Sequence, residues 1–348
     1  MVIYERDNVM SVNENTLEQA IISDLQDKGY EYIFGPDIDR DYHEVILRDA
    51  FDAALFRINA GITASMIEET YKTIKNLGLL KLEDINAAFH KYLIEGVPVP
   101  YKKDGENRTF TVKLVDFEYP ENNDFKVINQ FTVIDVKQKR PDILIFINGI
   151  PMVLFELKNT TKADTTIENA YNQIKNYQLD MPTLFAYNAF NVISDGLDTK
   201  MGTITANFNR YMAWKSEDGK TKTDGAMNFF TVMLNGVFPK ERLLDIIRNF
   251  IVFQNIKGKT VKIIAAYHQY YAVKKAVERT KKSLDEETGK VGVVWHTREV
   301  GKAYLWYFIQ DFLLATRFST TLQSLCLLTE TIWTINCLIL SAQAQNFC

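Results

Sequence analysis

Three charged side chains interrupt an otherwise apolar stretch, residues 140–159, which reads RPDILIFINGIPMVLFELKN. Asp142 stands at the start of the first apolar run, and Glu156 and Lys158 stand near the end of the second. Residues two apart on a strand point to the same face, so Glu156 and Lys158 project together. Buried charges are costly unless they are paired or bind a metal. Two carboxylates and a lysine at one end of a hairpin suit Mg²⁺-assisted phosphodiester hydrolysis. A buried Asp–Lys pair beside a surface Glu is the alternative interpretation.

The two apolar runs are joined by Asn148-Gly149, a strong signal for a β-hairpin. Both runs are apolar on both faces, which predicts a hairpin at the centre of a sheet. A two-residue loop without a bulge would pair Ile147 with Ile150 and would place Asp142 and Glu156 on opposite faces. A three-residue loop, or one bulge, would pair Ile147 with Pro151 and set Asp142 opposite Glu156. We predict the bulged register, because only this register joins the charges into one site.

Pro141-Asp142 followed by Glu156-Leu157-Lys158 resembles the PD-(D/E)xK nuclease motif. Gln173 and Tyr177 lie four residues apart, on one face of the helix expected next, and resemble an additional motif of the RecB-like branch. The amino-acid sequence of the whole 140–159 stretch resembles that of the restriction (HsdR) subunit of type I restriction–modification enzymes.

The resemblance implies a role for each matching residue. Asp142 and Glu156 would be Mg²⁺ ligands, and Lys158 would be the water-orienting base or a charge partner. Gln173 and Tyr177 would support the site and contact DNA. RecB-like nucleases often add a helical glutamate ahead of the sheet, and the matching candidate here is Glu18; a plain surface glutamate is the alternative reading of Glu18.

The fold expected from these features is α/β, with a PD-(D/E)xK restriction-endonuclease-like mixed sheet flanked by helices. Apolar periodicity predicts helices at 14–28, 165–180 and 241–253, and three or four short helices within 43–95. Strand-like runs at Thr109–Phe117 and Phe125–Ile134 are expected to flank the motif hairpin in one sheet. Further strands are expected at Leu184–Asn188 and Asn191–Asp195. The predicted endonuclease domain is 1–255, with a helical region at about 13–100 and a nuclease core at about 105–200.

Composition limits the classes of function. The 348 residues carry 40 Lys plus Arg against 44 Asp plus Glu, a net charge of −4, which is not a general nucleic-acid-binding footprint. Contacts to DNA therefore require a local basic patch. The candidates for the patch are Lys137, Lys139, Arg140, Lys158, Lys162 and Lys175. For the first three, a solvated strand end is the alternative interpretation. All three cysteines lie after residue 325, and the N-terminus lacks a signal-peptide pattern, so we expect a cytoplasmic protein.

Residues 256–297 are similar to the start of a RecA-like helicase domain, with a short strand followed by a helix. The segment KIIAAYHQYYAVKKAVERT resembles the adenine-reading region upstream of the motor in type I restriction helicases. Gln269 is the matching adenine contact, although His268 and the tyrosines of this segment could equally be core residues. The family's next feature is a phosphate-binding loop for ATP, of which this chain keeps only Gly301 and Lys302. We therefore expect that this chain does not bind ATP.

Residues 298–348 are interpreted as an out-of-frame tail. The stretch 298–311 can be back-translated and reread one nucleotide earlier as QGSGKSLSLVFYTG, the loop and helix expected of the family. The same shift lets 328–338 read as TDRNDLDDQLF, which resembles the family's next helicase motif. We infer a nucleotide lost near Thr297. The apolar residues 322–340 are near the short limit for a membrane span and include Glu330, so no membrane segment is expected.

Together these features predict a DNA endonuclease subunit of a type I restriction–modification system, truncated at the start of its motor. By resemblance, the intact enzyme acts on double-stranded DNA with methyltransferase (M) and specificity (S) subunits, uses Mg²⁺, and is driven by ATP. This chain would lack ATP-driven translocation. The alternatives are a catalytically silent nuclease-fold module that binds DNA or subunits, and a non-functional truncated product.

Overall fold

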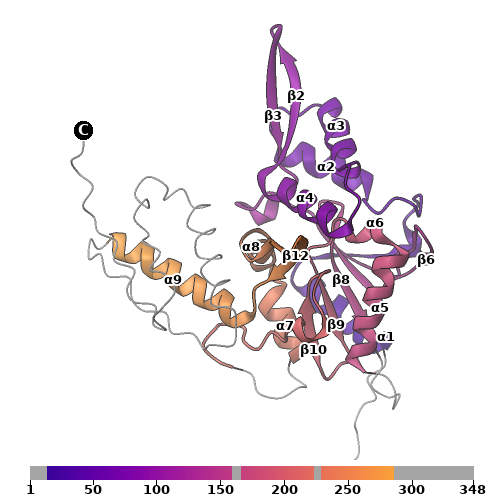
Figure 1. Cartoon of the computed structure of the whole chain (residues 1–348), viewed down its shortest axis with the longest axis vertical. Coiled ribbons are helices and arrows are strands. Elements are labelled where there is room, and N and C mark those ends of the chain that lie inside the picture. The colour runs from indigo at the N-terminus through magenta and orange to yellow at the C-terminus, as the bar shows by residue number, and fades with distance from the viewer. Residues whose placement is uncertain (1–13, 159–165, 223–228, 286–348) are drawn as a thin grey trace, which may run out of the picture. The chain divides into compact units, whose positions relative to one another are not determined.

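A six-stranded mixed sheet, in the order β1-β4-β7-β8-β9-β10, forms the centre of the computed structural model, which describes residues 14–158, 166–222 and 229–285 (Figure 1). Its strands are β1 (Glu31–Phe34), β4 (Phe125–Asn129), β7 (Ile143–Ile147), β8 (Ile150–Leu157), β9 (Phe190–Ser194) and β10 (Thr199–Gly202). The pairs β1–β4 and β8–β9 are parallel, and the other neighbours are antiparallel. The predicted mixed sheet is thus confirmed.

The hairpin β7–β8 occupies the middle of this sheet, and every residue of both strands is buried. Its turn is fixed by Asn148 and Gly149, both with positive φ. The Asn148 side chain accepts a hydrogen bond from the Asp124 N–H at 2.8 Å and donates to the Leu114 carbonyl at 2.9 Å. The turn therefore supplies a conformation that an Asn-Gly pair adopts readily, together with contacts that hold it against its surroundings.

Helices cover both faces of the sheet. The helices within residues 14–264 are α1 (Glu14–Asp27), α2 (Arg48–Ile58), α3 (Ala64–Lys75), α4 (Leu82–Glu95), α5 (Ile167–Asp180), α6 (Pro182–Phe185), α7 (Phe229–Val237) and α8 (Lys240–Asn249). A further helix, α9 (Tyr267–Asp285), belongs to a separate compact unit that begins at residue 265. Phe155 and Glu156 are successive residues of β8 and point to opposite faces. Phe155 packs on Phe238, directly after α7, with ring centroids 5.1 Å apart, whereas Tyr177 of α5 lies near Glu156. The predicted helices at 14–28 and 165–180 are confirmed, and the region 43–95 contains three helices.

The predicted strand Thr109–Phe117 does not join the central sheet, which is a correction. It belongs instead to β3 (Glu106–Val112), which pairs with β2 (Val97–Lys103) in a separate two-stranded hairpin that extends from the helical region beside α3 (Figure 1). Asp104 and Gly105 both have positive φ at its turn, and most residues of β3 are exposed. The Asp-Gly pair was the available signal for this hairpin.

Two other expected strands are also wrong in part. The run Phe125–Ile134 ends as a strand of the central sheet at Asn129, because Gln130 adopts a positive φ of 54°. Residues Val133–Ile134 form β5, which pairs with β6 (Gln138–Lys139) in a small separate ladder. The expected strand Leu184–Asn188 is the short helix α6 instead, with Pro182 at its start, where a missing N–H costs nothing.

Near the end of the described chain, α8 is followed by the antiparallel hairpin β11 (Ile251–Ile256) and β12 (Lys259–Ile264). The predicted helix 241–253 therefore ends earlier, at Asn249. Contacts divide the chain into two compact units, residues 1–264 and 265–348. The sequence predicts a boundary after residue 255, which stays a prediction. Among the described helices, none is long and apolar enough to cross a membrane.

Candidate active site

A bulge in the central hairpin brings the two predicted carboxylates to the same place. The turn pairs Ile147 with Ile150, so the expected pairing of Ile147 with Pro151 is wrong. The register then shifts between Ile145 and Phe146, and Ile143 pairs with Phe155. The next opposed pair along this ladder is Asp142 and Glu156. The predicted bulged register is confirmed, with its extra residue inside the strand rather than in the loop.

The three charged groups are linked by short contacts. The Leu157 N–H donates to Asp142 Oδ2 at 2.7 Å. Lys158 Nζ donates to Glu156 Oε1 at 2.6 Å and to the Leu157 carbonyl at 2.9 Å. Glu156 is 2% exposed, and its other oxygen, Oε2, is buried and makes no short hydrogen bond to the described residues, although the Tyr177 hydroxyl of α5 is near enough to act on the carboxylate. A buried carboxylate oxygen without a donor is a costly arrangement that a cation would relieve.

Burial dominates the electrostatics of both carboxyl groups. It raises the pKa of Asp142 to about 6, against the lowering effects of the Leu157 N–H and the Lys158 charge. Burial and the nearby Asp142 charge raise the pKa of Glu156 to about 8. For Lys158, burial alone would lower the pKa, but the Glu156 carboxylate outweighs it and the pKa is raised. Among the described residues, the half-buried Asp142 and the buried Glu156 thus share one nearby cationic side chain, that of Lys158.

These residues fit a Mg²⁺ ion. Hard cations prefer carboxylate oxygens, and Mg²⁺ is commonly held by one or two carboxylates while several waters remain bound. Asp142 and Glu156 converge from neighbouring strands, and Glu156 Oε2 is available as a ligand. Within the described residues, no group of three or more His, Cys, Asp or Glu side chains has a geometry for metal binding. A Mg²⁺ ion at this position would have Asp142 and Glu156 as its carboxylate donors.

Helix α5 brings the other two motif residues to the same site. Tyr177 is buried, and burial together with the Glu156 charge raises the pKa of its hydroxyl. Gln173, one turn earlier, donates a hydrogen bond that acts on the same hydroxyl and opposes this rise. Gln173, Tyr177 and Glu156 consequently form a continuous set of neighbours, as their spacing predicts.

Glu18 of α1 lies close to the site but is held by other residues. It is 8% exposed, and its carboxylate accepts hydrogen bonds from the side-chain amides of Asn129 and Gln130. Its charge is among those that raise the pKa of Asp142. Asn129 and Gln130 end the strand next to Asp142, and the Gln130 N–H donates to the Asp142 carbonyl at 3.1 Å. Sequence reasoning missed these two amides, because their proximity depends on the pairing of β4 with β7.

The predicted basic residues separate into different environments. Lys137 and Lys139 both pair with Asp180, at the end of α5, and Arg140 is exposed. Lys175 points elsewhere and donates to the Ile204 carbonyl at 2.7 Å; burial lowers its pKa to about 8. Lys162 lies outside the described residues. Asp180 was not singled out from the sequence, although its position seven residues after Gln173 puts both on one face of α5.

The motor-related candidates are described only in part. Gln269 is 5% exposed in α9, and its side-chain oxygen accepts a hydrogen bond from the Ala266 N–H at 2.9 Å. Its predicted contact with adenine stays a prediction. Gly301, Lys302 and the inferred out-of-frame tail lie outside the described residues.

Comparison with known proteins places this geometry in a family. Residues 11–210 match the family described as type I restriction enzyme R protein N terminus, which is more than half of the chain. The chain belongs to this family. All of the predicted site residues from Glu18 to Tyr177 lie within the matched region.

A second match continues beyond this region. Residues 268–329 match the SWI2/SNF2 ATPase family, in agreement with the expected start of a helicase motor. This match runs past Thr297, the point near which we infer the change of reading frame. The frame hypothesis stays a prediction, which the DNA sequence of the gene would test.

Relatives of the R protein family align with most of this chain. The HindI endonuclease subunit of Haemophilus influenzae is 36% identical over 320 residues, which cover 87% of this chain and 30% of that protein. The putative MjaIXP endonuclease subunit of Methanocaldococcus jannaschii is 35% identical over 328 residues, covering 85% of this chain and 31% of that protein. Both are named as subunits of type I restriction enzymes. The chain thus spans about a third of the length of these relatives.

Proposed function

We propose that this chain carries the DNA-cleaving site of a type I restriction enzyme and hydrolyses phosphodiester bonds with Mg²⁺. The main observation behind this proposal is the hairpin register, which sets Asp142 beside Glu156. The buried Glu156 Oε2, which makes no short hydrogen bond within the described part of the chain, supports it. Membership of the R protein family supports the nuclease class, and relatives named as endonuclease subunits support it further. We also propose that double-stranded DNA is the substrate.

Each residue has a specific part in this proposal. Asp142 and Glu156 would hold the Mg²⁺, which when bound would polarise the phosphate and activate a water. The Leu157 N–H fixes Asp142 Oδ2, so the carboxylate is oriented in advance. Lys158 has a raised pKa and keeps its proton at neutral pH, which favours the role of charge partner over that of base. Gln173 and Tyr177 would support Glu156 from α5 and face the DNA.

The whole enzyme is a larger proposal. Because the chain spans about a third of its relatives, we propose that the complete subunit acts with methyltransferase and specificity subunits and with an ATP-driven motor. Residues 268–329, with their match to SWI2/SNF2 ATPases, support the motor. Cleavage chemistry at the hairpin requires none of these parts, because the proposed metal ligands all come from β7, β8 and the residues beside them.

The test is nicking of supercoiled plasmid by the full chain without ATP. We expect open circles to accumulate with Mg²⁺, and no product with Ca²⁺ or EDTA, because Ca²⁺ is larger and geometrically less demanding. Nicking that continues in EDTA would overturn the metal mechanism. DNA binding without any nicking in Mg²⁺ would instead favour a silent binding module.

A further inference from the structure

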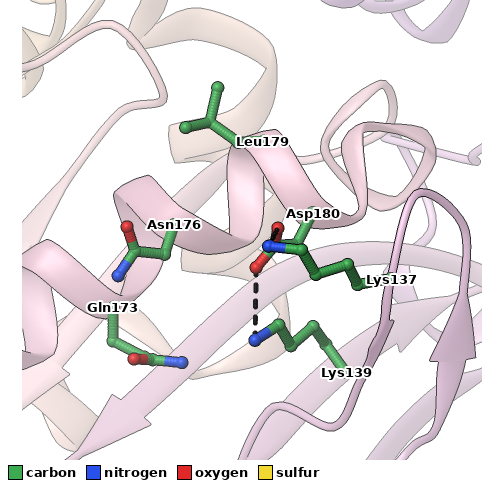
Figure 2. A pocket seen from close by; sticks show the side chains of 6 residues that line it. All are labelled: Lys137, Lys139, Gln173, Asn176, Leu179 and Asp180. Atoms are coloured by element: carbon green, nitrogen blue, oxygen red, sulfur yellow. Dashed lines mark ion pairs between the residues drawn. The ribbon is translucent and has the colours of Figure 1, made fainter.

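A polar pocket lies between the β5–β6 ladder and the C-terminal half of α5. Its volume is about 350 Å³, and its lining consists of Lys137, Lys139, Gln173, Asn176, Leu179 and Asp180 (Figure 2). Five of these six side chains are polar. The catalytic assignment uses only Gln173 from this set, so the pocket is a separate feature with its own chemistry.

The charges of the pocket favour an anion. Lys137 Nζ lies 2.8 Å from Asp180 Oδ1, and Lys139 Nζ lies 3.2 Å from Asp180 Oδ2, so one carboxylate holds both lysines. The pocket therefore has an excess of one positive charge. An ammonium group has three donors, and the amides of Gln173 and Asn176 add more. Several donors beside one excess positive charge match a phosphodiester, which is a monoanion with two free oxygens.

The backbone of the pocket is fixed while its lysines are accessible. The Lys137 N–H donates to the Asp180 carbonyl at 2.9 Å, and Lys139 pairs with Val133 in the β5–β6 ladder. The side chain of Lys137 is 66% exposed and that of Lys139 is 30% exposed, whereas that of Asp180 is 11% exposed. The ammonium groups can thus exchange a carboxylate oxygen for a phosphate oxygen without movement of the main chain.

Two connections place the pocket close to the proposed active site: the chain from Lys139 to Asp142, and the side chain of Gln173. Lys139 precedes Asp142 by three residues, which span at most about 10 Å of extended chain. Gln173 lines the pocket and also bonds the Tyr177 hydroxyl beside Glu156. A DNA strand that reaches the proposed active site would therefore pass close to the pocket.

We propose that this pocket binds a backbone phosphate of the DNA near the scissile one, and that Asp180 holds Lys137 and Lys139 in place until the phosphate replaces it. This inference rests on the proposed function, since it takes DNA as the substrate. It adds a second contact that sets the position of the strand relative to Asp142 and Glu156.

The first experiment measures binding of the full chain to a fluorescein-labelled 20-base-pair duplex by anisotropy, in EDTA so that no cleavage occurs. The Lys137→Gln/Lys139→Gln variant should lose one phosphate contact, which corresponds to about five-fold weaker binding at 0.15 M salt. The slope of log K against log salt should become shallower by about 0.9. The matched control is Lys72→Gln/Lys91→Gln, which removes two exposed lysines that also pair with glutamates.

The inference is overturned if the two double variants bind equally, or if the salt slope of the pocket variant is unchanged. Thermal unfolding of each variant checks that the fold is retained. The proposed function fails by a different result, namely nicking that does not depend on Mg²⁺. The two outcomes are measured independently, because binding is followed in EDTA.

The second experiment uses Asp180→Asn, which removes the competing carboxylate and keeps the size of the side chain. If Asp180 competes with phosphate, this variant should bind the duplex about five-fold more tightly than the parent. Glu95→Gln, which frees one exposed lysine elsewhere, is the control for the change in net charge. Equal affinity of Asp180→Asn and Glu95→Gln would contradict the competition.

Discussion

Glu156 is buried and Asp142 is half-buried, and burial is the main cause of the raised pKa values of both carboxyl groups. The pKa of Asp142 is raised to about 6 and that of Glu156 to about 8 in the metal-free protein, mainly by burial. A metal ion requires both groups to be ionised, so binding must release any proton that they hold. With a pKa of about 8, Glu156 holds a proton in most molecules at pH 6 and 7 and in about half of them at pH 8.

We therefore predict that Mg²⁺ affinity rises about tenfold per pH unit between pH 6 and 8 and levels off above this range. Isothermal titration calorimetry of the full chain at pH 6, 7, 8 and 9 would measure this. Glu156→Gln should weaken binding and flatten the pH profile, whereas Glu95→Gln should change neither. An affinity that is constant from pH 6 to 8 would contradict the proposed protonation of Glu156.

At this scale, the sequence was sufficient to predict which side chains lie close together at the candidate site. Asp142, Glu156 and Lys158 are recognisable because charge is rare in an apolar hairpin, and Gln173 and Tyr177 because of their helical spacing. The hydrogen bonds from Asn129 and Gln130 to Glu18 could not be predicted, because they depend on how α1 and β4 come together in the folded chain. The metal-ligand and catalytic roles stay predictions.

At the scale of elements, the turn of the β7–β8 hairpin positions the site. Gly149 has a φ of +76°, and a Cβ atom at this position would lie 2.5 Å from the Leu47 carbonyl oxygen and 2.7 Å from the Phe51 nitrogen. Both neighbours are backbone atoms at the start of α2 or beside it, so they cannot move aside cheaply. The glycine thus serves two needs, a left-handed conformation and a close approach.

Gly149→Ala should lower the free energy of unfolding by about 3 kcal/mol, of which about 1 kcal/mol comes from the conformation and the rest from the clash. Gly258→Ala is the matched control, because Gly258 has a φ of +77° but open space around its Cβ position, and it should cost only about 1 kcal/mol. Urea unfolding followed by circular dichroism would measure both. Equal losses would show that the contact with α2 is unimportant.

Helices and strands were predicted correctly from the sequence where the spacing of apolar residues fitted only one kind of element. The helices 14–28 and 165–180 and the buried hairpin have strong periodicity or strong turn signals. The run Thr109–Phe117 was assigned to the wrong sheet because its alternation fits any half-buried strand, and only the Asp104-Gly105 turn identifies its partner. Leu184–Asn188 was misassigned because its short apolar run does not distinguish a strand from a helical turn.

At the scale of the first compact unit, a buried lysine connects segments that are distant in the sequence. Lys262 of β12 is 2% exposed, and its Nζ donates to Asn86 Oδ1 at 2.8 Å and to the Asn188 carbonyl at 2.6 Å. Asn86 lies in α4, and Asn188 precedes β9 of the central sheet. Burial lowers the pKa of Lys262 well below its usual value. Nothing in the local sequence distinguishes this lysine from an exposed one.

This contact predicts a pH dependence of stability. Between the lowered pKa of folded Lys262 and its ordinary value near 10.5, the unfolded chain binds a proton that the folded chain does not. The contribution of Lys262 to the free energy of unfolding therefore rises with pH in this interval and falls on acidification. The free energy of unfolding of the parent, minus that of Lys262→Met, should therefore increase by up to about 1.4 kcal/mol for each unit that the pH is raised.

Urea unfolding at pH 7, 8 and 9 would measure this difference. Lys259→Met, which changes an exposed lysine on the same strand, should show a difference that is independent of pH. A difference for Lys262→Met that is equally flat would show that Lys262 is charged in the folded protein.

The central claim is that Asp142 and Glu156 form a working metallonuclease site, and nicking by the Asp142→Asn variant tests it most directly. Asparagine keeps an oxygen that can accept the Leu157 N–H but removes the charge that would hold Mg²⁺. With Mg²⁺ and supercoiled plasmid, we predict that the full chain produces open circles and that the variant, purified identically and equally stable to heat, produces none. Equal nicking by both proteins would contradict the claim.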